Sequence, residues 1–339
     1  MKAYVLHAVN ELHYEDIDIP ACPEGWAILK VKAVGICSSD IPRIFTKGTY
    51  HFPTIPGHEF SGIVDSVGRA ADSSWVGKHV GCFPLIPCRK CEPCSEGHYE
   101  MCAHYDYIGS RRDGAFAEYV AAPVWNLVEL PDSIPFEHAA MLEPLAVGLH
   151  ATKIAGIAKG DKVAVIGTGM IGITAAQWAR KFSSTDDIYV IGRNEEKRNI
   201  VESTGVRYIN QKEEKPADDF NVVIEAVGTP ASIDTALNIV KPGGTVVLMG
   251  NPSGDIPLAQ NTYWRILRKQ LTVCGTWNSA YAGRDASDWT EAVKALKEGS
   301  IKVASLITHK FAQEDAFAGF NLMHEHKEPY CKVMTIWNS

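Results

Sequence analysis

Short apolar segments alternate with amphipathic ones between residues 161 and 276, and this pattern constrains the fold more than any other feature of the chain. The apolar segments have the length of buried strands and lie at 162–166, 188–191, 221–226, 245–249 and 270–273. Apolar residues recur at helical spacing over 173–182, 195–203 and 231–240. Apolar strands that alternate with amphipathic helices predict a parallel sheet covered on both faces. We therefore expect an α/β region with a doubly wound parallel sheet.

A glycine-rich turn follows the first of these strands and opens the first helix. It places Gly167, Gly169 and Gly172 at the spacing G-x-G-x-x-G, with Met170 and Ile171 inside it. These glycines would let the backbone approach a pyrophosphate held at the positive end of the helix. A plain β–α turn that uses glycine only for a positive φ is the simpler interpretation. The strand before the turn and the helix after it favour a dinucleotide site.

The end of the second strand indicates which dinucleotide binds. A site for NAD has an acid there to hold the ribose hydroxyls, but this chain has Gly192 followed by Arg193. A small residue leaves room for a 2′-phosphate, which Arg193 can pair with, helped by Lys197 or Arg198. The pattern favours NADP, and NAD stays open if Glu195 or the next residue supplies the acid.

The first 130 residues have a different character, because β-branched residues, glycine and proline dominate short alternating runs. They predict a compact β domain. A chain of 339 residues also exceeds what one core usually serves. We expect a first domain of 1–147 with 277–339, and a cofactor domain of 148–276 in which Thr276 is a further cofactor contact.

Four cysteines lie in one short loop at 88–102. Cys88, Cys91, Cys94 and Cys102 have the spacing C-x2-C-x2-C-x7-C. Thiolates this close can converge on one tetrahedral ion, and four sulfur ligands leave no position for a substrate. The loop therefore predicts a structural zinc site and leaves the chemistry to be found elsewhere.

A second group of possible metal ligands is mixed. Cys37 ends an apolar strand, and His58 and Glu59 stand at another loop-to-strand junction. Cysteine, histidine and carboxylate together suit a catalytic zinc with an open position. Glu143, beside Pro144 where we expect a helix to start, is a further carboxylate. A buried cysteine or histidine is more often packed in a core than bound to a metal, so spacing alone leaves both interpretations open.

These motifs occur together in a characteristic order. Gly-Ile-Cys-Ser-Ser-Asp at 35–40, Gly-His-Glu-Phe-Ser-Gly at 57–62, the cysteine loop, Glu-Pro-Leu-Ala-Val-Gly at 143–148 and the glycine-rich turn span essentially the whole chain. The chain thus resembles the zinc-dependent medium-chain alcohol and polyol dehydrogenases. The resemblance implies a β-rich GroES-like catalytic domain, a Rossmann cofactor domain and a homodimer or homotetramer.

The same resemblance implies roles for the site residues and two Zn²⁺ per subunit. Cys37, His58 and Glu59 match the catalytic zinc motif, and Glu143 matches a carboxylate that binds this zinc directly or through water. The four cysteines match the structural zinc lobe. Ser39 takes the position of a hydroxyl that relays the proton. The expected reaction is transfer of a hydride from an alcohol, activated by zinc as a Lewis acid, to the nicotinamide.

Residues 105–119 and 40–45 resemble the branch of the family that oxidises sugar-alcohol phosphates, of the type galactitol 1-phosphate to tagatose 6-phosphate. Members of that branch use NAD, with an acid where Gly192 stands here, so the cofactor and the substrate assignment conflict. A phosphate needs cations, and Arg43, Arg111 and Arg112 are the candidates. The alternatives are free polyols such as sorbitol or xylitol, vicinal diols or threonine, which the same motifs would serve.

Charge and composition bear on partners. The net charge is −7 and no basic stripe occurs, which argues against nucleic acid, against a membrane surface and against a four-cysteine module that binds nucleic acid without catalysis. The N-terminus has no apolar h-region and no run approaches the ~20 residues of a membrane span. We expect a cytoplasmic enzyme that binds a small polyol or polyol phosphate.

Overall fold

The structure is a computed structural model that describes residues 1–283 and 287–338. It contains two compact units, one formed by Met1–Glu143 with Ala280–Ser339 and the other by Pro144–Ser279. The expected boundaries at 147 and 277 lie within four residues of these limits. Residues 284–286 and 339, which belong to the expected first domain, lie outside the described residues. No helix of the described part is long and apolar enough to cross a membrane.

The unit of Pro144–Ser279 has a six-stranded sheet in which every neighbouring pair is parallel. Its strands are β10 (Val163–Ile166), β11 (Ile188–Gly192), β12 (Arg207–Asn210), β13 (Phe220–Glu225), β14 (Val240–Leu248) and β15 (Thr272–Gly275). They lie in the order β12-β11-β10-β13-β14-β15. This is the order of a Rossmann fold, and it reverses between β10 and β13, where such sheets bind their ligands.

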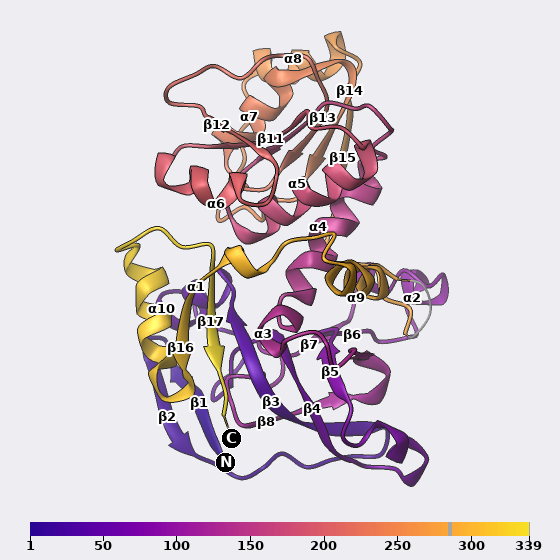
Figure 1. Cartoon of the computed structure of the whole chain (residues 1–339), viewed down its shortest axis with the longest axis vertical. Coiled ribbons are helices and arrows are strands. Elements are labelled where there is room, and N and C mark those ends of the chain that lie inside the picture. The colour runs from indigo at the N-terminus through magenta and orange to yellow at the C-terminus, as the bar shows by residue number, and fades with distance from the viewer. Residues whose placement is uncertain (284–286, 339) are drawn as a thin grey trace. The chain divides into compact units, whose positions relative to one another are not determined.

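Helices connect these strands, as Figure 1 shows in magenta and orange. They are α4 (Leu142–Ile154), which begins at the unit boundary, α5 (Met170–Ser183), η4 (Glu195–Lys197), α6 (Arg198–Glu202), α7 (Pro230–Ile239) and α8 (Gln260–Arg268). α7 starts at a capping box, because Thr229 and Ser232 each accept a hydrogen bond from the other's backbone N–H. All four residues of β10 are buried, as expected for a central parallel strand.

The other unit is built on a seven-stranded sheet. Its strands are β3 (Trp26–Ile36), β4 (Glu59–Val67), β5 (His79–Cys82), β8 (Tyr119–Pro123), β9 (Leu127–Glu129), β16 (Ile307–Ala312) and β17 (Lys332–Ile336). They run in the order β16-β17-β3-β4-β5-β9, with β8 also paired to β3. The C-terminal β17 pairs with β3, so the yellow end of the chain lies beside indigo and violet segments in Figure 1.

Short elements complete this unit. Two further pairs of strands are β1 (Lys2–Ala8) with β2 (Glu11–Asp16) and β6 (Leu85–Ile86) with β7 (Asp106–Tyr107). The helices are α1 (Asp40–Phe45), η1 (Ala70–Trp75), α2 (Glu92–Ser95), η2 (Tyr99–Met101), η3 (Val124–Asn126), α3 (Phe136–Ala139), α9 (Asp288–Glu298), η5 (Ala304–Leu306), η6 (Gln313–Asp315) and α10 (Ala316–Glu325).

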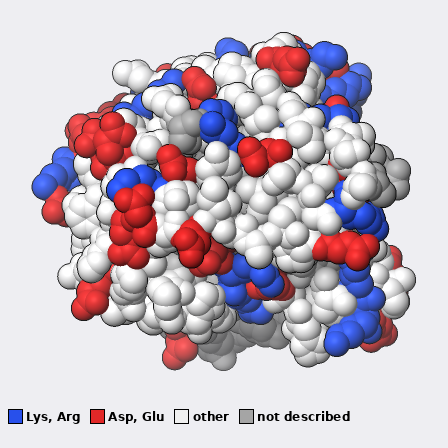
Figure 2. Space-filling model, turned by 90° about the horizontal axis from the view of Figure 1, so that it is seen from below, with Lys and Arg blue, Asp and Glu red and all other residues white. Residues whose placement is uncertain are grey.

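On the face of the molecule in Figure 2, acidic and basic side chains are interspersed among uncharged ones.

The expected α/β class with a β-rich domain and a parallel-sheet domain is confirmed. The C-terminal β17 pairs with β3 of the first unit. The expectation missed β1, β2, β12, β16 and α8. β12 follows α6 in a segment that carries Arg207 and Asn210 among its four residues, so its apolar run is too short to recognise. β2 consists mostly of polar residues, so its apolar periodicity is too weak to indicate a strand.

Candidate active site and cofactor site

The ends of two paired strands bring the mixed ligand group together. Cys37 follows β3, His58 precedes β4, and Gly35 of β3 stands opposite Glu59 of β4 in the antiparallel register. One ligand atom from each of Cys37, His58 and Glu59 lies within 4.8 Å of the other two. Residues 22 positions apart in sequence thus form one cluster, because the strand pairing places both loop-to-strand junctions at the same end of the sheet.

Polar contacts from Ser39 and from the start of α1 hold the loop that carries Cys37. The Asp40 carboxylate accepts a hydrogen bond from the Cys37 backbone N–H at 3.0 Å, and the Ser39 hydroxyl donates to the Cys37 sulfur at 3.3 Å. Arg43 donates to both Ser39 Oγ, at 2.9 Å, and Asp40 Oδ1, at 3.3 Å. Asp40 Oδ1 lies 3.6 Å from His58 Nδ1, so it faces the ring without a hydrogen bond of ordinary length.

A buried lysine stands on the other side of Glu59. The Lys332 ammonium, on β17, donates to Glu59 Oε2 and, at 3.2 Å, to the Ile36 carbonyl. Burial alone would lower the pKa of Lys332, but attraction to Glu59 and Cys37 raises it above its ordinary value. A Cβ at Gly35 would lie 2.6 Å from Glu59 Oε2, so this pair needs glycine at that position. No sequence motif pointed to Lys332. A lysine at the start of a largely apolar strand was the available signal.

Glu143 lies next to this cluster and is paired with a tyrosine. The Tyr107 hydroxyl donates to Glu143 Oε1 at 3.3 Å, and the Tyr107 ring packs edge-on against His58 with centroids 5.7 Å apart. Burial raises the pKa of Glu143 to about 7, with Glu59 adding to the rise and His58 opposing it. Burial also holds the pKa of Tyr107 well above its ordinary value, and the Glu143 carboxylate adds to this. Tyr107 lies in the stretch 105–119 that the sequence singled out, although no role was expected of it.

The residues present fit a zinc ion. His58 Nδ1 is buried and has no hydrogen-bond partner among the described residues, which is costly unless something else binds the ring. Burial, and then Glu59, raise the pKa of the Cys37 thiol to about 12, so this sulfur needs a cation beside it to ionise. Thiolate, imidazole and carboxylate are ligands that zinc accepts in sites that keep one position open.

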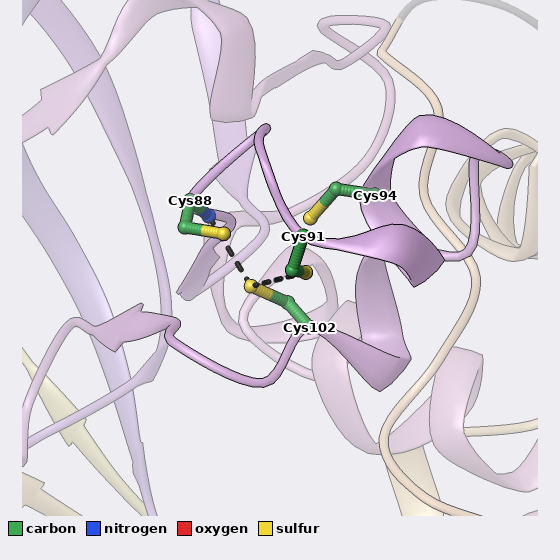
Figure 3. A group of neighbouring side chains, drawn as sticks. All are labelled: Cys88, Cys91, Cys94 and Cys102. Atoms are coloured by element: carbon green, nitrogen blue, oxygen red, sulfur yellow. Dashed lines mark hydrogen bonds between the residues drawn. The ribbon is translucent and has the colours of Figure 1, made fainter.

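The four cysteines of the loop also converge, from the turn before α2, from α2 itself and from the end of η2 (Figure 3). The Cys91 sulfur lies 3.8 Å from that of Cys102, which accepts a hydrogen bond from the Cys88 backbone N–H at 3.2 Å. The backbone N–H groups of Cys94 and Ala103 lower the pKa of Cys91 to about 6. Backbone N–H groups also lower the pKa of Cys88, whereas burial raises the pKa of Cys94 to about 12 and raises that of Cys102. Four converging sulfur atoms fit a closed zinc site, in which the cation would favour the thiolate form of the two buried cysteines.

A cavity of about 420 Å³ lies at the carboxyl ends of β10, β11 and β13. Its lining includes Gly167, Gly169, Gly192 and Arg193 together with Gln211, which the sequence had not indicated. The cavity lies where the strand order reverses, as the position of the glycine-rich turn requires. It is therefore suited to a nucleotide whose phosphates lie at the start of α5.

The other expected cofactor residues take several positions. Met170 and Ile171 form the first turn of α5 and do not line the cavity, and neither does Arg198. Arg198 instead pairs with Glu195 and with Glu202, the latter at 3.2 Å.

Thr276 and Gly192 are two further residues that the sequence placed at the cofactor. Thr276 follows β15, and its hydroxyl is buried without a hydrogen-bond partner among the described residues. A Cβ at Gly192 would lie 2.5 Å from Thr168 Cγ2 and 2.7 Å from the Tyr208 hydroxyl, so a carboxylate side chain could enter here only if those groups moved.

Two of the three candidate phosphate ligands are engaged elsewhere. Arg111 stacks between the rings of Tyr50 and Tyr105, with its guanidinium carbon 4.6 and 4.1 Å from the centroids. Arg112 donates to Asp106 at 2.9 and 2.8 Å. Arg43, by contrast, contacts Ser39 and Asp40, which follow the zinc-ligand candidate Cys37.

Known proteins share these features. Residues 23–132 match the model of the alcohol dehydrogenase GroES-like domain, and residues 171–298 match that of zinc-binding dehydrogenases. Galactitol 1-phosphate 5-dehydrogenase of Escherichia coli is 36% identical over 292 residues, which cover 83% of this chain and 84% of that protein. The chain belongs to the zinc-dependent medium-chain polyol dehydrogenases. Sorbitol dehydrogenase 1 of Saccharomyces cerevisiae, 32% identical over 96% of this chain and 94% of its own, is a further relative.

Solved structures of other polyol dehydrogenases and zinc-binding dehydrogenases superpose closely. The crystal structure of the E. coli galactitol-1-phosphate dehydrogenase has a TM-score of 0.91 at 33% identity and covers 99% of this chain and all of that one. A zinc-binding dehydrogenase of Sinorhizobium meliloti bound to NADP (TM-score 0.88, 27% identity, 99% and 98% covered) and an E. coli dehydrogenase complexed with NADH (0.89, 27%, 99% and 99%) have the same fold. The family thus uses zinc and a nicotinamide cofactor, and the chain is a polyol or alcohol dehydrogenase.

Proposed function

We propose that this dehydrogenase oxidises a sugar-alcohol phosphate, as galactitol-1-phosphate 5-dehydrogenase does, with galactitol 1-phosphate going to tagatose 6-phosphate. The observation that carries the proposal is Arg43. Its guanidinium is part-buried and donates to Ser39 Oγ, two residues after Cys37, and to Asp40 Oδ1, so it places a cation beside the mixed ligand group. A guanidinium can pair with two phosphate oxygens at once. The identity with the E. coli enzyme supports the same substrate class.

Arg111 and Arg112 stay in the proposal as outer contacts. Their backbone N–H groups both donate to the Tyr107 carbonyl, at 3.0 and 3.1 Å. They are thus anchored to the residue whose hydroxyl donates to Glu143. To bind a phosphate, Arg112 must break its ion pair with Asp106, and Arg111 must give up its stacking on Tyr50 and Tyr105. We therefore expect them to contribute less than Arg43.

Zinc held by Cys37, His58 and Glu59 would supply Lewis acidity to the substrate hydroxyl, and the nicotinamide would accept the hydride. The chain's own residues handle the proton and the geometry. The Ser39 hydroxyl is our candidate for the first proton acceptor, since it lies against Cys37 and its oxygen already accepts from Arg43. Glu143, whose pKa of about 7 lets it exchange protons near neutrality, is placed to bind the zinc or to take the proton. Lys332 holds one Glu59 oxygen and thereby fixes the carboxylate's orientation.

For the cofactor we propose NADP rather than NAD. Gly192 and Arg193 line the cavity, whereas Glu195 is turned to Arg198 and Asn210. Among the described residues no acid lines this cavity, neither Glu195 nor Glu196, and this supports Arg193 as the partner of a 2′-phosphate. Arg193→Gln should lower kcat/KM for NADP by about tenfold, the value of a lost charged contact of ~1.4 kcal/mol, and leave NAD unchanged.

We further propose two zinc ions per subunit, a cytoplasmic location and a homodimer or homotetramer. β15 is the edge strand of its sheet, and Val273 and Trp277 beside it are exposed. An apolar edge strand of this kind can pair with that of a second copy across a two-fold axis. Mass measurement in solution tests the assembly, and metal analysis after dialysis tests the zinc count.

The deciding experiment is a paired assay of galactitol 1-phosphate, galactitol and sorbitol, each with NAD and NADP. We expect the phosphate ester with NADP to have the highest kcat/KM. Arg43→Gln should raise KM for the ester and leave KM for the free polyols unchanged, while Lys30→Gln on β3 serves as the matched control for lost charge. Equal kcat/KM for free and phosphorylated hexitols would refute the phosphate assignment.

Dehydrogenation of a free polyol is the second candidate. The engaged state of Arg111 and Arg112 favours it, and so does the sorbitol dehydrogenase among the relatives. Sorbitol would then have a higher kcat/KM than the ester in the same assay, and Arg43→Gln would change KM equally for both substrates.

A further inference from the structure

The hairpin of β1 and β2 carries a third group of possible metal ligands, far in sequence from the cysteine loop. One ligand atom from each of His7, His13 and Glu15 lies within 4.8 Å of the other two. Both histidines are exposed and Glu15 is half-buried, so an ion from solution can reach them. We propose that this hairpin binds a divalent late transition-metal ion, such as Zn²⁺ or Ni²⁺, in addition to the ions of the catalytic and structural sites.

Strand register explains why the three side chains meet. His13 stands opposite Val5 in the antiparallel pair, and Glu15 opposite Ala3. Side chains two residues apart on a strand share a face, so His13 and Glu15 point the same way, and His7 shares the face of Val5. An irregularity of the register between Leu6 and Ala8 falls at His7. It frees this residue from regular pairing and lets its ring lean toward the neighbouring strand.

The distances suit an ion. His7 Nε2 and Glu15 Oε1 are hydrogen-bonded to one another at 3.0 Å, a contact that an ion between them would replace, and the rings of His7 and His13 have centroids 5.3 Å apart at 52°. Two ligand atoms that each lie about 2.0–2.1 Å from a tetrahedral zinc are roughly 3.3 Å from one another. The histidine and the carboxylate are thus already at nearly the separation that a shared ion imposes, and a ring rotation brings in His13.

The donor set selects the ion. Two imidazoles and one carboxylate suit zinc and nickel, whereas calcium and magnesium prefer oxygen ligands alone. Three protein ligands leave the remaining positions to water, and exposure of the histidines makes exchange with solvent easy. The hairpin ion should therefore be lost to a chelator before the ions of the buried mixed group and the closed cysteine loop.

The test uses the full-length protein loaded with zinc and then dialysed, titrated with Ni²⁺ by calorimetry. We expect one equivalent to bind, with zinc retained by metal analysis. His13→Ala should weaken Ni²⁺ at least tenfold and Glu15→Gln several-fold, while Asp16→Asn, which removes a carboxylate from the opposite face of the same strand, should have no effect. Paramagnetic Ni²⁺ should broaden the imidazole NMR signals of His7 and His13 before those of any other histidine.

Two results would overturn the proposal. One is equal Ni²⁺ affinity for the parent protein and His13→Ala. The other is broadening that begins at histidines outside the hairpin. Because neither histidine belongs to the proposed active site, turnover of His13→Ala should equal that of the parent, and this readout also shows that the variant is folded. Failure of the hairpin site would leave the proposed dehydrogenase activity untouched.

Discussion

The two ligand groups of the first unit differ in how the chain assembles them. Cys88, Cys91, Cys94 and Cys102 come from one stretch of 15 positions and consist of four like donors, tuned by backbone N–H groups of the same loop. Cys37, His58 and Glu59 come from two strand ends, and side chains of other elements surround them. A local loop of sulfur donors forms a closed site, whereas a site that must bind a substrate depends on distant parts of the fold.

The two groups should therefore differ in whether their loss affects the stability of the protein or its catalytic rate. With the proposed structural zinc, loss of a cysteine would remove a crosslink from the loop, whereas loss of a residue in the mixed group would disturb buried charges that include Lys332, Glu143 and Asp40. The first should cost stability and the second should cost chemistry.

The largest expected effect contrasts Cys37→Ser with Cys94→Ser. Loss of Cys37 should lower kcat/KM by on the order of 10³-fold, because Lewis-acid stabilisation is worth several kcal/mol. Loss of Cys94 should lower the melting temperature and the zinc content by one ion while the folded, assembled fraction keeps its kcat. If Cys37→Ser and Cys94→Ser were equally folded and lost turnover to a similar extent, the assignment of catalysis to one group and stability to the other would be contradicted.

The next effect concerns the buried ion pair. Lys332→Met leaves Glu59 buried without its partner and should reduce the free energy of unfolding by about 3–5 kcal/mol. Lys310→Met, on the adjacent β16, breaks only an exposed pair with Glu137 and should cost less than about 1 kcal/mol. Denaturant unfolding measures both. Recovery of stability in Lys332→Met with Glu59→Gln would support the pairing, and equal losses at 332 and 310 would speak against it.

Glu143 should give the zinc-free protein a characteristic pH dependence. Its pKa is about 7 in the folded state and 4.5 ordinarily, so the protonated carboxyl favours folding below pH 4.5, and this contribution disappears as the pH rises through 7. The parent protein should lose on the order of 3 kcal/mol across this window relative to Glu143→Gln. The exposed Asp65→Asn is the control. Parallel stability curves for the parent and Glu143→Gln would exclude a raised pKa.

The smallest effect is expected at Tyr107. Tyr107→Phe removes one hydrogen bond to Glu143 and should cost about 1 kcal/mol of stability, with a several-fold loss of kcat/KM. Unchanged stability together with unchanged kinetics would mean that this bond does not position Glu143.

How much the sequence could reveal follows from the same contrast. The cysteine loop and the glycine-rich turn are encoded by spacing within about 15 residues, so both could be located before any fold was known. Cys37, His58 and Glu59 were found only as neighbours of strand ends, and the family resemblance linked them. Lys332, Tyr107 and the contact of Arg43 with Ser39 depend on strand register and on loops that meet in space, which no local pattern reports.

Stepwise removal of zinc is the most direct test of where the chemistry lies. In His13→Ala protein, which lacks the proposed hairpin site, zinc content and NADPH formation are measured together as a chelator acts. Turnover should fall to zero as the first zinc per subunit leaves. The melting temperature of the protein should stay unchanged, because the cysteine loop keeps its zinc. One equivalent of added zinc should restore turnover. Turnover that persists until the last zinc leaves would contradict the assignment of catalysis to Cys37, His58 and Glu59.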